Sequence, residues 1–475
     1  MAPGLIIGTW RIAGGRKILM SDPITQNSGG LIIAAPSSGS GKTVFTLGLL
    51  RHLLRSGKDI ASAKTGPDYI DPAFHAAATG KPCYNLDSWA MRPDLLATTA
   101  AELSGDGNGI VVCEGVMGLF DGATAEQGST ADLSEITGWP VVLVIDAGSQ
   151  GASAAAVLRG FATHRPGLAL AGVVFNRTGG PRHETILRDA VARMDMDIPV
   201  IGCIPRSTGL SLPDRHLGLV QASEKPELDG FLDAAADLID KHIDVDALLA
   251  KVRPLKSAQP GETPTRPLKP LGQRIAIASD EAFSFRYPLT VEGWQSQGAE
   301  ISFFSPLDDE APPDNADAVY LPGGYPELHG FRLATSNRFM DGLRGAADRG
   351  ALIYGECGGY MVLGKGMVDA DSHRHAMAGL LGLETSFAKR RLHLGYRDIE
   401  LDAVAALGCG NVLGVPGARF RGHEFHYATV LKEGPGAPLF KSRDVAGNDL
   451  GLAGLSDGRV IGSFVHLIDH VDDDA

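Results

Sequence analysis

The sequence predicts two α/β domains in tandem, because two separate series of short apolar runs alternate with segments of helical length. The runs of the first series are rich in Val and Ile, which is typical of parallel strands buried on both faces. They lie at residues 31–35, 59–64, 110–114, 141–146, 169–176 and 200–206. Helices between consecutive parallel strands predict a doubly wound sheet.

A second alternating series begins at Arg274 with the segments RIAIASD, EISFFSP, AVYLPGG and ALIYGEC. Before it, a proline-rich segment without apolar periodicity indicates a linker. The length of 475 residues also exceeds what one hydrophobic core usually serves. We expect a disordered extension over residues 1–29, with Met20 as an alternative start. The first domain is expected over 30–250, the linker over 251–273 and the second domain over 274–475.

The composition narrows the class of protein. Hydrophobic residues make up 44% of the chain and charged residues 21%, which is an ordinary globular balance. The formal net charge of −13 argues against nucleic acid or an anionic membrane as the main partner. Five cysteines without a C-x-x-C pair indicate reduced thiols in the cytoplasm. No apolar run reaches the roughly 18 residues of a membrane span.

A phosphate-binding loop is predicted in LIIAAPSSGSGKTVFTLGLL, where an apolar run leads through small residues into an amphipathic helix. Small residues let backbone N–H groups converge on phosphate oxygens at a helix N-terminus. The strict loop pattern has glycine where this chain has Pro36, so a turn that only caps the helix is the alternative. The residues expected to bind the nucleotide are Gly39, Ser40, Gly41, Lys42 and Thr43.

Charged residues follow the second and third apolar runs, in KTGPDYIDP and EGVMGLFDG. They are Lys64, Asp68, Asp71, Glu114 and Asp121. Ligands of open parallel sheets bind at the carboxyl ends of the strands, so these residues are expected to face the phosphates. Carboxylates there hold Mg²⁺ or order a nucleophile. The expected metal ligands are Thr43, Asp68 and Glu114, and a helix-capping role for Asp68 or Asp71 is the alternative.

The segment ALIYGECGGYMVLG predicts a thiol nucleophile at Cys357, because an apolar strand runs into a glycine-flanked turn and then a helix. A helix N-terminus favours the thiolate. The backbone N–H groups expected to form an oxyanion hole are those of Gly323, Gly324 and Gly358. The alternative is a buried, inert cysteine.

A thiol nucleophile needs a base, and His466 in GSFVHLIDH is the expected one, with His426 in RGHEFHYA as its rival. A histidine that only packs beside a core strand is the alternative for His466. A thiolate can release ammonia from a carboxamide, and a nucleotide site can activate a carboxylate as an acyl phosphate. The two sites together therefore predict an amide synthase.

From about Gly30 onward the chain resembles the cobyrinic acid a,c-diamide synthase family. The motifs that carry the resemblance are APSSGSGKT, KTGPDYIDPAFH, NLDSWAM, EGVMGLFDG, LPDRHLGLV, DEAFSFRYP, LPGGYPE, YGECGGYMVLG, GHEFHYA and SFVHL. The resemblance implies a P-loop domain similar to dethiobiotin synthetase and a class I glutamine amidotransferase-like domain. It also implies that ATP, Mg²⁺ and L-glutamine are used to amidate the a- and c-acetate carboxylates of a corrin-type tetrapyrrole.

The resemblance also implies roles for individual residues. The catalytic set is Cys357, His466, Asp68, Asp71 and Asp121, and the substrate-binding pair is Lys64 and Tyr69. Ordinary class I glutaminases carry a glutamate two residues after the histidine. Here Ile468 stands at that position and Asp469 follows it, so the group that orients His466 stays open.

Several alternatives remain at this level. The macrocycle is either hydrogenobyrinate or cobyrinate, and the alanine- and arginine-rich composition favours the first. Cobyric acid synthase amidates other side chains, but KTGPDYIDP and NLDSWAM match the a,c-enzymes better. A partitioning-type P-loop ATPase would give Cys357 no role, and a dethiobiotin synthetase with a fused domain would carboxylate a diaminoacid. The chain is compatible with a homodimer.

Overall fold

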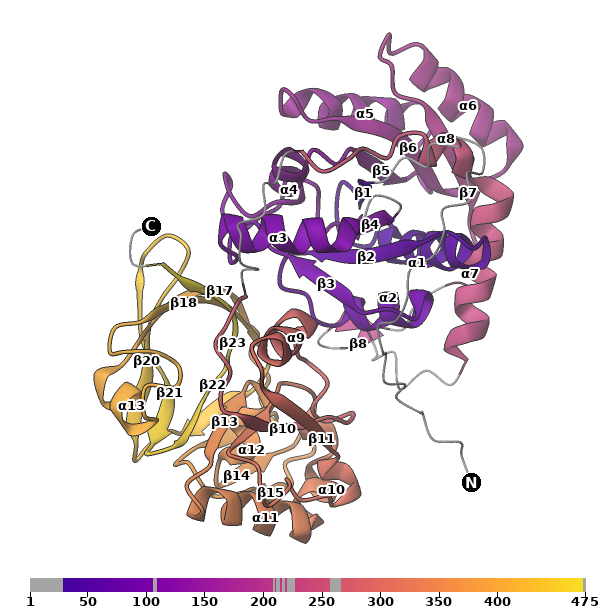
Figure 1. Ribbon diagram of the computed structural model, residues 1–475. Helices are drawn as coiled ribbons and strands as arrows, with labels where there is room; N and C mark the ends of the chain where they lie inside the picture. The colour runs from indigo at the N-terminus through magenta and orange to yellow at the C-terminus, as the bar shows by residue number, and fades with distance from the viewer. Residues whose placement is uncertain are drawn as a thin grey trace, which may run out of the picture.

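The computed structural model describes residues 29–105, 109–207, 210, 214–215, 218–219, 227–256 and 266–472. Apart from Gly29, the extension expected over residues 1–29 lies outside the described residues, as does the middle of the expected linker. Two large sheets organise the described chain, one in each half of the sequence (Figure 1). Within these residues, no helix is both long and apolar enough to cross a membrane.

The first half folds around a seven-stranded parallel sheet of order β3-β2-β4-β1-β5-β6-β7. Its strands are β1 (Gly29–Ala34), β2 (Ile60–Thr65), β3 (Cys83–Leu86), β4 (Ile110–Glu114), β5 (Val141–Asp146), β6 (Leu170–Thr178) and β7 (Val200–Pro205). The helices are α1 (Lys42–Arg55), α2 (Asp71–Thr79), α3 (Pro93–Ser104), α4 (Thr130–Thr137), α5 (Ser153–His164), α6 (Pro181–Ala192), α7 (Leu228–His242) and α8 (Val245–Leu249). A two-stranded ladder joins β8 (Asp214–Arg215) to β9 (Gly218–Leu219).

This arrangement confirms the predicted doubly wound sheet. Strand β1 lies between β4 and β5, so the chain winds outward from it in both directions. Helix α1 packs on α2 and α7, while α5 packs on α6. The expected strands lie within two residues of the observed bounds, but β3 was not predicted because it is a four-residue strand at the sheet edge. The carboxyl ends of β1, β2 and β4 meet at the point where the strand order reverses, which is where open α/β sheets bind ligands.

The second half contains a ten-stranded sheet of order β11-β10-β12-β13-β22-β21-β20-β17-β18-β23. Its strands are β10 (Arg274–Ala278), β11 (Glu300–Phe304), β12 (Ala318–Leu321), β13 (Leu352–Glu356), β17 (His393–Leu401), β18 (Arg419–His426), β20 (Ala437–Arg443), β21 (Asp449–Asp457), β22 (Val460–Ser463) and β23 (Val465–Val471). A small sheet contains β14 (Gly366–Val368), β15 (Arg374–Ala376), β16 (Glu384–Ser386) and β19 (Thr429–Lys432). The helices are α9 (Pro288–Ser296), α10 (Gly330–Thr335), α11 (Asn337–Asp348), α12 (Gly358–Leu363), α13 (Ala403–Gly408) and the 3₁₀ turns η2 (Pro306–Asp308) and η3 (Pro326–Leu328).

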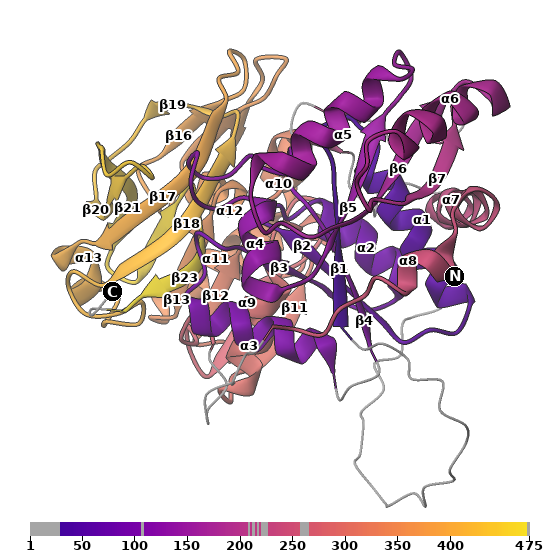
Figure 2. The same ribbon diagram turned by 90° about the horizontal axis from the view of Figure 1, so that it is seen from above.

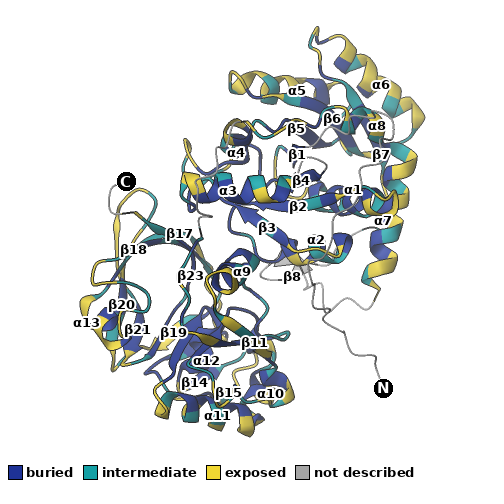
Figure 3. Ribbon diagram, viewed as in Figure 1, coloured by how far each residue is buried: buried dark blue, intermediate teal, exposed yellow. Residues whose placement is uncertain are grey.

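Strands β10 to β13 and β22 are parallel, as the second alternating series predicted. The sheet then continues as antiparallel strands, and β17, β18 and β23 reach the first half of the chain (Figure 2). The apolar core of the first half includes residues from the second half, namely Phe285, Tyr287, Leu289, Tyr325 and Ile468. Figure 3 shows buried residues running through both sheets. The two halves are therefore joined by packed side chains as well as by the linker.

A buried ion pair fixes this junction. The Asp469 carboxylate, whose side chain is 0% exposed, accepts hydrogen bonds from Arg92 N at 2.8 Å, Nε at 3.0 Å and Nη2 at 3.2 Å. Tyr396 Oη donates to Asp87 at 2.7 Å, and Tyr287 Oη donates to the Pro67 carbonyl at 2.9 Å. The first contact holds the last strand against the start of α3, and the other two hold the second half of the chain against the loops after β3 and β2.

We expect Asp469→Ala to lower the free energy of unfolding by about 3 kcal/mol, because Arg92 would stay half-buried without its partner. The measurement is urea denaturation followed by fluorescence. Lys441→Ala, which removes an exposed pair with Glu400, is the control and should change stability little. Equal decreases in the free energy of unfolding in the two variants would contradict a structural role for the Arg92–Asp469 pair.

Candidate functional site

The predicted phosphate loop lies between β1 and α1, and its geometry requires glycine. Gly39 and Gly41 have φ of +78° and +91°, in the left-handed region that glycine favours. A Cβ on Gly41 would stand 2.1 Å from Asn176 Nδ2. That amide donates to the Ser40 carbonyl at 2.9 Å from the end of β6. Asn176 was missed as a site residue, although its place at a strand end is the signal that found the acids.

The two residues that open α1 are already held by the neighbouring strand end. Lys42 Nζ donates to the Met117 carbonyl at 2.9 Å, and Thr43 Oγ1 donates to Glu114 Oε1 at 2.7 Å. Burial lowers the pKa of Lys42, and the Glu114 charge opposes this shift. The loop thus places a buried cation and a hydroxyl where phosphate oxygens and Mg²⁺ are expected.

A buried network of charges lies behind the loop. Lys64 Nζ is 2.5 Å from Asp71 Oδ2, 3.1 Å from Glu114 Oε1 and 3.7 Å from Asp68 Oδ2. His75 Nε2, which the sequence interpretation did not include, is 2.7 Å from Glu114 Oε2. Four predicted residues therefore meet within one network, because the ends of β2 and β4 are adjacent in the sheet.

The network gives its two buried acids different protonation behaviour. Burial alone would raise the pKa of Glu114, but the Lys64 charge and the His75 hydrogen bond outweigh it and the pKa is lowered. Burial and the Asp68 charge raise the pKa of Asp71 to about 7, against the attraction of Lys64. The network thus favours the ionised form of Glu114, whereas burial and the Asp68 charge disfavour the ionised form of Asp71.

The other two acids make local contacts as well. Asp68 Oδ1 accepts from Ile70 N at 2.8 Å and from Asp71 N at 3.2 Å, so it caps the turn before α2 while its second oxygen faces Lys64. Asp121 is exposed, and its Oδ2 accepts from Gly118 N at 2.9 Å. Asp68 lines the cavity described next, and Asp121 does not.

A cavity of about 900 Å³ opens between the two halves of the chain. The phosphate loop and the acids line one side, and β17 and β18 line the other with Tyr396, Arg397, His423 and Phe425. Its cationic residues are Lys42, Lys64, Arg177 and Arg397. Arg177, Tyr396 and Arg397 lie in no local motif, so only the fold identifies them as residues of this cavity.

Cys357 occupies a strained turn between β13 and α12, as the nucleophile elbow predicts. Its φ is +49°, which is uncommon for a residue with a side chain. The turn is tight, since a Cβ on Gly359 would stand 1.9 Å from the Leu321 carbonyl oxygen. Cys357 is 2% exposed, and burial followed by the Glu327 charge raises the pKa of its thiol.

The three glycines expected in the oxyanion hole surround this turn. Gly358 N contacts the Cys357 thiol. Gly324 N lies 3.0 Å from the position that a Cβ on Gly358 would take. A Cβ on Gly323 would stand 3.0 Å from His466 Nε2 and 3.2 Å from Cys357 Cβ. The fold thus brings the loop after β12, the cysteine and His466 to one point.

His466 lies on β23 and is 1% exposed. Its ring contacts the Tyr69 ring with centroids 4.6 Å apart, so a side chain from the β2 loop touches the expected base. Burial, and then the neighbouring His423 and His426, lower its pKa to about 3. Asp469 is engaged by Arg92 and Ile468 is buried in the first core, so neither residue following His466 orients it.

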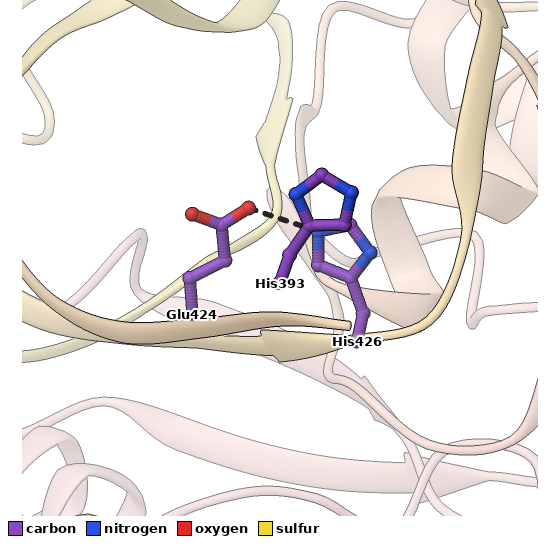
Figure 4. A group of neighbouring side chains, drawn as sticks. All are labelled: His393, Glu424 and His426. Atoms are coloured by element: carbon purple, nitrogen blue, oxygen red, sulfur yellow. Dashed lines mark hydrogen bonds and ion pairs between the residues drawn. The ribbon is translucent and has the colours of Figure 1, made fainter. Parts of the chain in front are cut away.

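The rival base, His426, belongs to a different cluster (Figure 4). Its Nε2 is 2.9 Å from Glu424 Oε1, while Arg397 Nη2 is 2.7 Å from Glu424 Oε2. The ring stacks on His393 at 4.7 Å and 5°, and on Phe464 at 3.9 Å. His393, Glu424 and His426 are the kinds of side chain that bind metals. However, parallel stacked rings do not direct their in-plane lone pairs to one point, and Arg397 already neutralises Glu424.

Comparison with known proteins identifies two family domains in the chain. Residues 31–220 match the CobQ/CobB/MinD/ParA nucleotide binding domain, and residues 274–473 match the CobB/CobQ-like glutamine amidotransferase domain. A hydrogenobyrinate a,c-diamide synthase of Brucella anthropi is 52% identical over 93% of this chain and 98% of its own length. The proteins of that name from Rhizobium meliloti and Rhodobacter capsulatus are 52% and 49% identical, over 93% and 94% of this chain and 99% and 100% of their own.

The chain belongs to the hydrogenobyrinate a,c-diamide synthase family. Membership confirms the resemblance found in the motifs and the predicted pair of α/β domains. Named members of the family are synthases with a glutamine amidotransferase domain, as expected for a glutamine-dependent amide ligase. The glutamine amidotransferase domain argues against a partitioning-type ATPase.

His423, which lines the cavity, predicts that the free energy of unfolding depends on pH. Burial and the Arg397 charge lower the pKa of His423 to about 4, from an ordinary value of 6.5. Between pH 6.5 and 4 the unfolded chain takes up a proton that the folded chain does not, so stability is full above pH 6.5 and falls as the pH falls. In His423→Gln, the free energy of unfolding measured by urea denaturation should fall less over this pH range, by on the order of 3 kcal/mol. The control is His373→Gln, because this histidine side chain is 74% exposed. Its stability should depend on pH as in the parent chain. Identical profiles for all three proteins would contradict the assignment.

Proposed function

We propose that this chain amidates the a- and c-acetate carboxylates of hydrogenobyrinate, using ATP and glutamine, through an acyl phosphate. One observation carries the proposal. The Tyr69 ring contacts His466 beside the cysteine elbow, while Asp68, next to Tyr69, lines the cavity of the phosphate loop. A nitrogen donor site and a carboxylate-activating site are therefore neighbours within one folded unit.

The glutaminase half begins with proton transfer from the Cys357 thiol to His466. The thiolate then attacks the glutamine carboxamide, and the Gly324 and Gly358 N–H groups stabilise the oxyanion. His466 returns the proton to the leaving nitrogen, which departs as ammonia and leaves a thioester for water to hydrolyse. Burial of both side chains excludes solvent until glutamine enters.

The synthetase half activates the carboxylate. The phosphate loop and Lys42 would hold the phosphates of ATP. Thr43, Asp68 and Glu114 offer oxygen ligands that suit Mg²⁺, which when bound offsets the phosphate charge. Attack of the acetate oxygen on the γ-phosphorus releases ADP, and ammonia then displaces phosphate from the acyl carbon. Asp71, with a pKa of about 7, is suited to take the proton that ammonia loses.

The substrate is a polycarboxylate, whereas the chain carries a net charge of −13. Cationic side chains of the cavity offset this charge locally. Arg177 and Arg397 line the cavity from opposite halves of the chain, where they also pair with Asp146 and Glu424. The cavity of about 900 Å³ is lined mostly by apolar surface, as expected for a macrocycle. The names of the relatives favour hydrogenobyrinate over cobyrinate.

The experiment that tests the proposal is incubation with Mg-ATP, amide-¹⁵N glutamine and either macrocycle, followed by mass spectrometry. We expect two labelled nitrogens in each hydrogenobyrinate. Label only in cobyrinate would move the substrate to the cobalt-containing macrocycle. Hydrolysis of both ATP and glutamine without label in either macrocycle would contradict the substrate and indicate another carboxylate.

The separation of the two sites gives a second prediction. Cys357→Ala should abolish glutamine-supported synthesis and keep ammonia-supported synthesis, because only the nitrogen source is lost. Lys42→Ala should abolish both, since either source needs an activated carboxylate. Product formation is read by mass spectrometry with each source. Ammonia-supported synthesis lost in Cys357→Ala, or surviving in Lys42→Ala, would contradict this division of labour.

A further inference from the structure

Within the described part of the chain, neither ring nitrogen of the expected base, His466, has a hydrogen-bond partner, although the side chain is buried. Its Nε2 lies on the side of Gly323 and Cys357. Its Nδ1 therefore faces away from the thiol, where a triad would place a carboxylate. Asp469 does not fill this position because it pairs with Arg92.

The carboxylate nearest to that nitrogen belongs to Glu356, the residue before the cysteine. Its Oε2 is 3.7 Å from His466 Nδ1, and its side chain is 4% exposed. This separation is within ion-pair range and longer than a hydrogen bond. Such contacts are often long in the absence of substrate and tighten when it binds.

Glu356 is held firmly in this position. Tyr320 Oη donates to its Oε2 at 2.6 Å, Tyr354 Oη to its Oε1 at 2.8 Å, and Leu467 N to its Oε1 at 3.1 Å. These donors come from β12, β13 and β23, which meet in one sheet. Oε2 accepts only the Tyr320 bond among the described contacts, so it keeps a lone pair for an N–H donor.

We propose that Glu356 is the positioning carboxylate of the glutaminase site. Ordinary class I glutaminases carry a glutamate two residues after the histidine, where this chain has Ile468, and Glu356 takes the role of orienting His466. The inference rests on the proposed function. Glu356 fixes the tautomer in which Nδ1 carries the proton and Nε2 accepts the thiol proton. It also stabilises the imidazolium that forms when Cys357 becomes a thiolate. The proton then moves from Nε2 to the leaving nitrogen, and the Glu356 carboxylate stays ionised throughout.

The groups around Glu356 define the expected pH dependence. Burial raises its pKa to about 7, opposed by hydrogen bonds from Tyr320, Leu467 and Tyr354. A pocket on its far side is lined by further charged or titratable residues, which are Lys269, Arg286, Tyr287, Arg419, His470 and Asp472. His423, His426 and Glu424 act on His466. The ionised carboxylate is the active form, so glutaminase activity should rise with pH through about 7.

The test is the pH profile of glutamate release from glutamine, measured with Mg-ATP and hydrogenobyrinate present. We expect Glu356→Gln to lower kcat by roughly 10²- to 10⁴-fold with little change in KM for glutamine. The rise through pH 7 should disappear in this variant. Glu356→Asp should restore part of kcat. Glu300→Gln, at an exposed glutamate of β11, is the matched control and should behave as the parent chain.

Tyr320→Phe keeps the inference testable if Glu356→Gln does not fold. Loss of this donor should raise the pKa of Glu356, so the acid limb of the profile should move to higher pH, which a structural role alone would not cause. A parent-like kcat and profile in Glu356→Gln, or an unshifted limb in Tyr320→Phe, would overturn the inference. Absence of glutamate release from the parent chain would instead overturn the proposed function.

Discussion

The contact between the rings of Tyr69 and His466 sets the geometry on which both sites depend. Tyr69 belongs to the loop after β2, next to the acid that faces Lys64, whereas His466 belongs to the last strand of the chain. Two further residues of the second half contact Tyr69. The Phe285 ring stacks on the Tyr69 ring with centroids 4.6 Å apart, and Tyr69 Oη donates to the Phe425 carbonyl at 3.4 Å. A change in the β2 loop would therefore reach the cysteine elbow through packed rings.

Charge is distributed to suit this junction. The surface is acidic, but the cavity brings lysine and arginine side chains from both halves of the chain to one place. Lys64 lies between the buried acids Glu114 and Asp71, and the surroundings lower the pKa of the first and raise that of the second. The proposed substrate and nucleotide would thus meet cationic side chains at the cavity wall, with the acids Asp71 and Glu114 beside them.

Much of this organisation could be predicted from the sequence. Strand ends bring distant residues together by a general rule, so the loop at Lys42, the acids after β2 and β4, and the elbow at Cys357 were found from local patterns. The family assignment agrees with the motifs that contain these residues.

Other parts depend on contacts between segments that no local pattern records. Arg397 lies on a half-exposed strand whose position over the cavity is set by the antiparallel arm of the second sheet. Glu356 adjoins the cysteine in sequence, yet it lies near His466 because β22 pairs with β13 and β23 follows directly after β22. Asp469 stands three residues after His466, yet its partner, Arg92, is 377 residues away.

The burial of Cys357 has a consequence for the chemical durability of the protein. Oxidants attack thiolates that solvent can reach, and the steps from sulfenic to sulfonic acid follow from that exposure. A thiol that is 2% exposed and held protonated by its surroundings meets neither condition. Cys357 is therefore expected to react with oxidants more slowly than an exposed thiol of low pKa would.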